Sequence, residues 1–274
     1  MTALPVWLDP LHEAAEMRAA DAWAIEEQGV PQEDLMERAA LGLARVTAAI
    51  AREGPIRIVV GKGNNGGDGR VAARLLVEDG HEVEVIDGTE PFEPGALSGS
   101  GVVVDALLGT GFEGEPREPI ASAIWAINRQ DAPVVACDVP SGVNASTGEV
   151  EADAVRATAT ATFHGSKVGL YVEPGKGHAG SVQVVDIGIP RGAPEPRAAG
   201  LISERVLDLY PHREAMGDLL IAADAGMPAQ ELDALARQED LRRRALHGLK
   251  RLYRRARAAC QPTAASGLAS VEAK

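Results

Sequence analysis

A strand-like apolar run leads directly into a glycine-rich segment between Arg57 and Gly69, and this junction constrains the fold more than any other part of the chain. The run is followed by Gly-Lys-Gly-Asn-Asn-Gly-Gly-Asp-Gly, and a helical pattern begins at Val71. A strand, a glycine turn and a helix are how α/β proteins present backbone N–H groups to a phosphate. The sequence therefore predicts a site for a nucleotide-like ligand. The polar side chains of this segment would bind a further polar group beside that ligand.

Apolar runs alternate with helical patterns through most of the chain. The predicted helices are His12–Gln28, Gln32–Arg52, Val71–Glu78 and Pro119–Asn128. The predicted strands are Ile56–Val60, Glu82–Ile86, Val102–Leu107, Pro133–Cys137, Thr158–Phe163 and Val182–Ile187. Continuous Val/Ile-rich strands with crossover helices are typical of a mostly parallel sheet covered on both faces. The last strands lie closer together in sequence, which leaves an antiparallel or irregular edge open there.

The sheet pattern stops after the Pro-rich segment that ends at Pro196. A short helix is expected over Ser203–Leu209, and a longer one over Gln230–Ala259 with a strongly basic stretch. We therefore expect an α/β domain over residues 1–211 and a helical, partly basic tail of unknown role over 212–274.

Bulk composition excludes several classes of protein. The net charge of −13 argues against a general nucleic-acid binder, because phosphate backbones require clustered Lys and Arg. The two cysteines, Cys137 and Cys260, do not suggest a disulfide framework or a thiolate metal site. No segment has the pattern of a secretion signal or the length of an apolar membrane span, so we expect a cytoplasmic protein without membrane association.

Polar residues stand at the ends of the other buried strands, where an open parallel sheet binds ligands. Asp105 ends one strand, and a carboxylate there requires a partner, a bound cation or local backbone N–H groups to cap. The glycine-rich loop that follows Asp105 could wrap a phosphate with its amides. Asp138 ends the next strand and is the candidate for proton transfer, since partial burial can tune a carboxylate toward a neutral pKa. Ser141 is a poor nucleophile candidate but a plausible oxygen ligand for a hard cation.

The segment His164-Gly-Ser-Lys167 follows the strand that ends at Phe163. Lys167 could contact a ligand phosphate, neutralise the crowded carboxylates, or lie in a solvated loop. A structural role is expected for His164 rather than a catalytic one.

Three motifs, in this order and spacing, resemble the NAD(P)H-hydrate epimerase family, also called the YjeF N-terminal domain family. They are Gly-Lys-Gly-Asn-Asn-Gly-Gly-Asp-Gly, Val-Asp-Ala-x-x-Gly-Thr-Gly-Phe and Asp-x-Pro-Ser-Gly. Met17-Arg-x-x-Asp21, Leu35-Met-Glu-Arg-Ala39 and the run from Gly180 to Pro190 are also similar to that family. The resemblance covers residues 11–209 or thereabouts, and the three motifs together are highly specific.

The resemblance implies a Rossmann-like three-layer α/β/α sandwich that interconverts the R and S epimers of hydrated NADH and NADPH. It implies that Asp138 binds the substrate, and we interpret Asp138 as the catalytic acid–base group and Lys167 as a further binding residue. It implies one potassium ion per subunit, held by Asn65, Asp105 and Ser141. The remaining substrate-binding residues would be Asn64, Asn65, Gly66, Gly67, Asp68, Gly109, Thr110, Gly111, Phe112, Glu113, Gly114 and Glu115.

The family also implies a functional partner, a dehydratase that accepts only the S-hydrate, and a homodimer is a further expectation because members are often dimeric. Many members continue into that dehydratase domain, but residues 212–274 lack its glycine-rich loops, so a separate dehydratase is expected. Arg70 stands where the family usually has an apolar or aromatic residue, which predicts a slightly different junction between loop and helix.

Two alternatives remain open. Gly61-x-Gly63-x-x-Gly66 with Asp87 downstream formally matches the dinucleotide fingerprint of an NAD-dependent oxidoreductase. A non-catalytic scaffold or binding protein is the second, because relatives with this fold serve in mRNA decapping and in apolipoprotein binding.

Overall fold

The computed structural model describes residues 8–93, 95–194 and 199–202. Chain contacts divide the protein into two units, one of residues 10–199 and the other of residues 1–9 and 200–274. The fold below is that of the first unit. The expected boundary at residue 211, the helices over 203–209 and 230–259, and Cys260 all lie outside the described residues.

A six-stranded parallel sheet forms the centre of residues 10–199, in the order β3-β2-β4-β5-β6-β8. Its strands, in chain order, are β2 (Ile56–Val60), β3 (Val83–Asp87), β4 (Val102–Ala106), β5 (Val134–Cys137), β6 (Ala159–Phe163) and β8 (Ser181–Val185). Each overlaps one of the predicted strands. The fold class, a mostly parallel α/β sheet, is confirmed.

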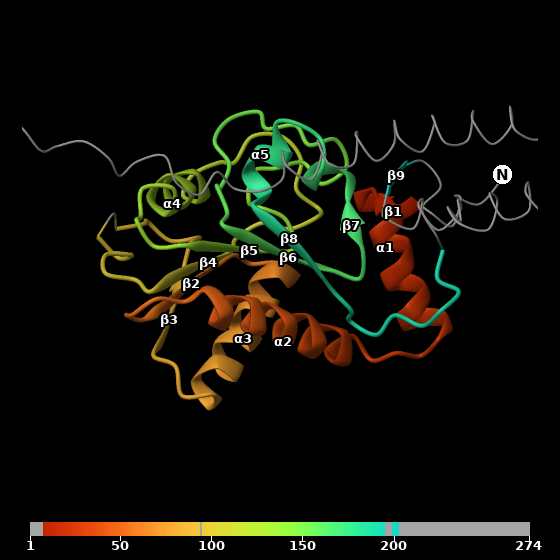
Figure 1. The fold of residues 1–274 in the computed structure, drawn as a ribbon, viewed down its shortest axis with the longest axis horizontal. Coiled ribbons are helices and arrows are strands. Elements are labelled where there is room, and N and C mark those ends of the chain that lie inside the picture. Colours follow the sequence, from red (N-terminus) through yellow and green to blue (C-terminus); the bar gives the residue numbers. More distant parts are fainter. Residues whose placement is uncertain (1–7, 94, 195–198, 203–274) are drawn as a thin grey trace, which may run out of the picture. The chain divides into compact units, whose positions relative to one another are not determined.

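Helices cover both faces of this sheet, as Figure 1 shows. The helices α2 (Gln32–Ile50) and α3 (Asn64–Glu78) lie on one face, and α4 (Ile120–Ile127) and the short α5 (Gly175–Ala179) lie on the other. The strands β4, β5 and β6 are buried along their whole length, which is why they appear in the sequence as unbroken apolar runs.

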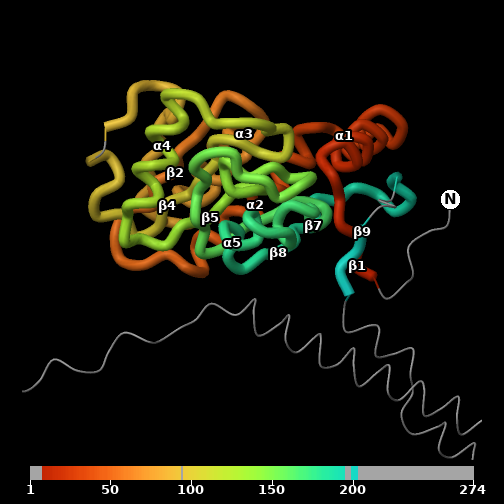
Figure 2. Tube along the Cα trace, turned by 90° about the horizontal axis from the view of Figure 1, so that it is seen from above, coloured from red at the N-terminus to blue at the C-terminus, as the bar shows by residue number. Residues whose placement is uncertain are grey.

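The first helix, α1 (Ala14–Ala22), continues into a π-helical turn at Trp23–Glu27. Both views place α1 at the end of the molecule where β7 (Ser166–Lys167) lies, away from α4 (Figures 1 and 2). The expected helix from His12 starts too early, because His12 belongs to the strand β1 (Leu8–His12), whose residues Leu11 and His12 pair with β7. The last described strand is β9 (Ala199–Ile202).

The sheet edge that the sequence left open as antiparallel or irregular is parallel and regular. β6 pairs with β8 in parallel over its full length, from Ala159 opposite Ser181 to Phe163 opposite Val185. The connection consists of β7, a 3-10 turn at Val168–Leu170 and α5. These short elements complete a parallel crossover without a long helix. The short distance along the chain between β6 and β8 therefore did not exclude parallel pairing.

The sheet reverses its order of winding between β2 and β4. From β2 the chain moves to β3 on one side, and from β4 it moves through β5 to β6 on the other. Ligands in open parallel sheets bind at such a reversal, outside the carboxyl ends of the strands. The segments that follow β2, β4 and β5 therefore meet where the sequence motifs lie.

The glycine-rich segment is a helix rather than a loop over most of its length, which corrects the prediction. Gly63 is extended, and α3 begins at Asn64, so the Asn-Asn-Gly-Gly-Asp residues form its first turns. Glycine is needed there for close packing: a Cβ on Gly69 would lie 2.7 Å from the Cβ of Ala106, and one on Gly66 would lie 2.1 Å from the carbonyl oxygen of Gly61.

Replacing Gly66 with alanine should destabilise the fold, because the new methyl group meets backbone that cannot move aside. Gly67→Ala on the same helix is the matched control, since its Cβ meets only the flexible end of Met36, at 3.2 Å. Both changes gain the same helix propensity, so we expect Gly66→Ala to be less stable by about 1–3 kcal/mol, as in other overpacked sites. Urea denaturation measures the difference, and equal midpoints for the two variants would contradict this packing.

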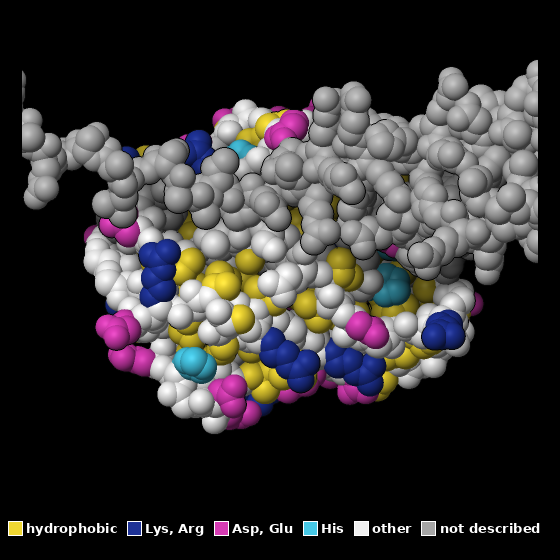
Figure 3. Space-filling view, viewed as in Figure 1, with side chains coloured by type: hydrophobic (Ala, Val, Ile, Leu, Met, Phe, Trp, Pro, Cys, Tyr) yellow, Lys and Arg dark blue, Asp and Glu magenta, His cyan; other side chains and the backbone are white. Residues whose placement is uncertain are grey.

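Acidic and basic side chains are interspersed over α2 and α3 (Figure 3), where Arg74 pairs with Glu37 and with Glu78. This part of the surface does not carry the basic stripe that phosphate backbones require. Within the part of the chain that the structure describes, no helix combines the length and apolar character needed to cross a membrane.

Candidate functional site

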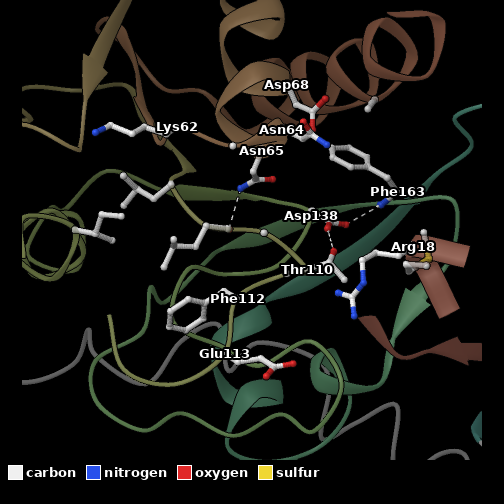
Figure 4. Close-up of a pocket in the computed structure, with 18 of the residues that line it drawn as sticks. Arg18, Lys62, Asn64, Asn65, Asp68, Thr110, Phe112, Glu113, Asp138 and Phe163 are labelled. Atoms are coloured by element: carbon white, nitrogen blue, oxygen red, sulfur yellow. Dashed lines mark hydrogen bonds between the residues drawn. The ribbon is translucent and has the colours of Figure 1, made fainter. Parts of the chain in front are cut away.

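A cavity of about 1030 Å³ opens beyond the carboxyl ends of β2, β4 and β5, bounded by α1, α2 and α3 (Figure 4). Its size lies at the upper end of the range for small-molecule sites. The predicted binding residues that line it are Asn64, Asn65, Asp68, Gly109, Thr110, Gly111, Phe112, Glu113, Gly114, Glu115, Asp138 and Lys167.

Four expected site residues do not line the cavity. Gly66 faces the backbone of Gly61 and Gly67 faces Met36, because both are packing positions of α3. Asp105 and Ser141 are almost fully buried, and they lie beneath the segment that follows β4.

Asn65, Asp105 and Ser141 meet at Leu108. The amide nitrogen of Asn65 donates to the Leu108 carbonyl oxygen at 2.9 Å, and Leu108 N–H donates to the Ser141 hydroxyl at 2.9 Å. The Ser141 hydroxyl in turn donates to Asp105 at 2.6 Å, and its backbone N–H donates to the other carboxylate oxygen at 2.8 Å. The strand-end segments after β2, β4 and β5 are thus tied together at one point.

The carboxyl group of Asp105 is completely buried, and no cationic side chain among the described residues forms an ion pair with it. Burial raises its pKa to about 6, even though hydrogen bonds from Ser141 and Leu107 favour the charged form. The oxygen atoms of a buried carboxylate without a counter-charge are suitable ligands for a hard cation.

Asp138 lies just after β5 with a left-handed backbone conformation, φ 67°. One of its carboxylate oxygens accepts a hydrogen bond from Lys167 Nζ at 2.6 Å and a weaker one from the Thr162 hydroxyl at 3.3 Å. The other oxygen accepts a hydrogen bond from the hydroxyl of Thr110, which belongs to the glycine-rich loop after β4 (Figure 4). The side chain is therefore held in one position at the wall of the cavity.

Asp138 is ionised at neutral pH, which corrects the expectation of a nearly neutral pKa. Burial alone would raise the pKa of this carboxyl group. The charge of Lys167 and the hydrogen bonds from Lys167 and Thr110 outweigh burial and hold the pKa below its usual value.

Lys167 neutralises a carboxylate, and the solvated-loop alternative is wrong, because its side chain is only 1% exposed. Its ammonium group donates to Asp138, to the Thr162 hydroxyl at 2.9 Å and to the Phe163 carbonyl oxygen at 2.8 Å. All three N–H groups are therefore used, and the buried charge is both paired and hydrogen-bonded, as a buried lysine requires.

Asp68, from α3, also lines the cavity and is 8% exposed. Burial, followed by the nearby charges of Asp138 and Asp21, raises its pKa to about 8. Two carboxyl groups in one cavity thus have pKa values shifted in opposite directions.

Arg18 and Asp21 line the cavity from α1 and were not predicted as site residues. Their spacing of three places them on one face of a helix. The motif Met17-Arg-x-x-Asp21 was therefore the available signal. Thr162 was not predicted as a site residue, because the sequence of an apolar strand does not indicate that its threonine contacts Lys167.

His164 packs edge-on against His12, with ring centroids 5.6 Å apart, and it does not line the cavity. Burial lowers the pKa of both histidines. The carboxylate of Asp87, the acidic residue of the formal dinucleotide fingerprint, accepts hydrogen bonds from Thr89 and likewise lies outside the cavity lining. Arg70 donates to the Gly61 carbonyl oxygen at 3.1 Å and so bridges the turn to the helix.

Comparison with protein families identifies residues 32–95 and 87–169 as matching the family described as "YjeF-related protein N-terminus". The chain is 40% identical over 205 residues to the NAD(P)H-hydrate epimerase of Limosilactobacillus reuteri, a match that covers 65% of this chain and 95% of that enzyme. It is also 40% identical over 222 residues to the bifunctional NAD(P)H-hydrate repair enzyme Nnr of Salinibacter ruber. That match covers 66% of this chain and 41% of the bifunctional enzyme.

Among solved structures, the crystal structure of yeast ynu0 (YNL200c) superimposes with a TM-score of 0.54 at 20% identity. The match covers 64% of this chain and 86% of the yeast chain. At this level of identity the likeness concerns the fold.

Proposed function

Because this chain belongs to the family of YjeF-related protein N-termini, we propose that it is an isomerase, an NAD(P)H-hydrate epimerase that interconverts the R and S forms of hydrated NADH and NADPH. The single observation that carries the proposal is an ionised carboxylate, Asp138, fixed at the wall of a cavity large enough for a nicotinamide nucleotide. The cavity lies at the reversal point of the sheet, where such nucleotides bind.

The chemistry requires a proton to move at one oxygen atom. The hydrate carries a hydroxyl group on the carbon next to the ring nitrogen, and inversion breaks that C–O bond and remakes it on the other face. The leaving hydroxyl must be protonated as the bond breaks, and the water that adds to the other face must lose a proton. The ionised Asp138 carboxylate accepts this second proton. Lys167 and Thr110 orient the carboxylate, while the N-terminus of α3 and the Gly109–Glu115 loop position the ring and the phosphates.

Two observations disfavour the alternatives. An oxidoreductase would leave the Asp138–Lys167 pair without a role, and the acidic residue of its fingerprint is bonded to Thr89 rather than facing the cavity. A scaffold would not need an ionised carboxylate inside a cavity of this size.

A coupled assay tests the proposed activity. Pure R-hydrate, a dehydratase strict for the S-hydrate and its nucleotide are supplied in excess, and recovery of reduced-cofactor absorbance is followed. We expect this protein to accelerate recovery in proportion to its concentration. Recovery no faster than without the protein would contradict the proposal.

We propose that one potassium ion per subunit binds at Asn65, Asp105 and Ser141. The residues present fit such an ion: an amide, a completely buried carboxylate without a described counter-charge, and a hydroxyl. Asn65 and Ser141 are joined through Leu108, and Asp105 accepts hydrogen bonds from Ser141. When bound, the ion would neutralise Asp105 and stiffen the loop that follows β4.

Potassium should raise the thermal stability of the protein, since an ion that binds only the folded state stabilises it by mass action. Binding at about 100 times the dissociation constant contributes about 2.7 kcal/mol, which corresponds to several degrees in Tm for a domain of this size. Calorimetry in KCl against tetramethylammonium chloride at equal ionic strength measures the shift. Equal Tm values in the two salts, or an unchanged shift in Asp105→Asn, would contradict the site.

A separate dehydratase that consumes the S-hydrate is the functional partner we propose, with a cytoplasmic location and a homodimeric state. The support for a partner is the match to the bifunctional NAD(P)H-hydrate repair enzyme, whose name indicates a second function in the same chain. Size-exclusion chromatography with light scattering tests the homodimer.

A further inference from the structure

We propose that Asp68 is a second catalytic acid–base group, which exchanges a proton with the substrate hydroxyl oxygen on the ring face opposite to Asp138. The proposal rests on the proposed epimerase function and deepens it. An inversion that breaks and remakes one bond uses both faces of the ring, so a single carboxylate on one side cannot serve both halves of the reaction equally.

The two carboxyl groups reach the same cavity from different elements. Asp68 projects from α3, and Asp138 projects from the end of β5 (Figure 4). Each is 8% exposed. Phe163 and Asn64 also line this cavity, so its wall is partly apolar.

Asp68 differs from Asp138 in its partners. Among the described residues, the carboxyl group of Asp68 has no hydrogen-bond donor and no ion-pair partner, whereas Asp138 has Thr110, Thr162 and Lys167. A buried, unpartnered carboxyl group is costly unless it is neutral or has a ligand to contact. Asp68 is therefore a group whose partner is expected in the cavity.

The charges that shift the pKa of Asp68 favour its neutral form. After burial, Asp138 at the end of β5 and Asp21 from α1 both raise this pKa. Arg18, Lys62 and Lys167 line the same cavity, but among the described residues none of them forms an ion pair with Asp68, and Lys167 is paired with Asp138. Burial raises the pKa of the Cys137 thiol well above its usual value, so this thiol stays neutral and adds no charge. At neutral pH Asp68 is therefore protonated while Asp138 is ionised, the arrangement from which acid and base roles follow.

The step balances without any added reagent. The Asp68 proton goes to the hydroxyl oxygen, the C–O electron pair leaves with water, and the ring nitrogen lone pair forms a C=N⁺ bond. Water then adds to the opposite face, the C=N⁺ electron pair returns to nitrogen, and the Asp138 carboxylate takes the proton of the adding water. After this step Asp68 is ionised and Asp138 is protonated, which is the starting state for the reverse epimerisation. Proton exchange with solvent also restores the original protonation states.

The kinetic test compares Asp68→Asn with wild type and with Asp79→Asn, an exposed position at the opposite, C-terminal end of the same helix. Pure R-hydrate is incubated at pH 6–9.5 and the epimers are separated by chromatography. We expect kcat/KM of the wild type to fall above pH 8 or so, because the acid form is lost. Asp68→Asn should lower kcat by about 100-fold or more with little change in KM and without that alkaline fall, Asp68→Glu should recover part of the rate, and Asp79→Asn should match wild type.

The outcomes separate this proposal from the one on which it rests. An active wild type with Asp68→Asn within threefold of its rate, or with the alkaline fall retained, overturns the role of Asp68 and leaves the epimerase function standing. A wild type that does not epimerise overturns the proposed function, and the role of Asp68 falls with it.

Thermal denaturation gives a readout that does not depend on activity. A carboxyl group whose pKa is raised on folding makes the folded state less stable as pH rises between its unfolded and folded pKa values. Asp68→Asn removes this loss, so its Tm should exceed that of wild type by more at pH 8.5 than at pH 5. A constant or reversed difference would overturn the neutral state of Asp68.

Discussion

Asp138→Asn should lower the rate of epimerisation by about 10²–10⁴-fold, the usual contribution of a positioned acid–base group. The asparagine amide has nearly the same shape, but it cannot accept the proton of the water that adds to the ring. The measurement is kcat/KM for pure R-hydrate at pH 7, with binding of a substrate analogue as a separate readout. Turnover within threefold of wild type would remove Asp138 from the mechanism.

The same substitution should also destabilise the fold, because it leaves the buried ammonium of Lys167 without a counter-charge. Removing one partner of a buried ion pair typically costs about 3–5 kcal/mol. The kinetic comparison must therefore be made well below the Tm of the variant. Circular dichroism confirms that the variant is folded under the assay conditions.

Lys167→Met should destabilise the fold by a similar amount, about 3–5 kcal/mol, because Asp138 then keeps a buried charge with only neutral hydrogen-bond donors. Lys176→Met on α5 is a matched control, since it removes an amine that lies partly exposed. Urea denaturation at pH 7 measures the loss. A change below about 1 kcal/mol would contradict the pair as a determinant of stability.

The pH dependence of this loss follows from the lowered pKa of Asp138. A carboxyl group with a lowered folded pKa stabilises the fold above its unfolded pKa, and that contribution is lost as pH falls through the folded value. The difference between wild type and Lys167→Met should therefore be largest near neutral pH and shrink below pH 4 or so. The double variant Asp138→Asn/Lys167→Met should recover much of the stability and none of the activity, because no buried charge remains.

The parallel sheet could be predicted from the sequence because its inner strands are buried on both faces. Runs such as Ile56–Val60 and Val102–Ala106 are apolar at nearly every position, and crossover segments separate them. The edge at β8 was not predictable in the same way. Its crossover is made of short elements that carry no helical periodicity, and the parallel pairing depends on packing that spacing does not encode.

The start of α3 was hidden by its glycines. Gly66 and Gly69 have low helix propensity, so the segment appeared to be a loop. In the folded protein, contact with the backbone of Gly61 and with Ala106 selects glycine within a helix. Tertiary packing therefore outweighs local preference at the very residues that mark the site.

The residue types of the candidate site were evident from the sequence, but their charge states were not. Asp138 has a lowered pKa because Lys167 lies 2.6 Å away, and Asp68 has a raised pKa because it is buried without a donor. Asp138 follows β5, Lys167 lies in β7 and Asp68 lies in α3, so their contacts depend on the tertiary fold. No spacing along the chain reports them, which is why the neutral pKa was assigned to the wrong aspartate.

The most direct test starts from each epimer separately, without a dehydratase. Pure R-hydrate and pure S-hydrate are incubated with the protein in parallel, and the two forms are followed by chromatography. We expect both mixtures to converge on one R to S ratio far faster than in buffer, with Asp138→Asn close to the spontaneous rate. Mixtures that change only at the spontaneous rate with the wild-type protein would contradict the account.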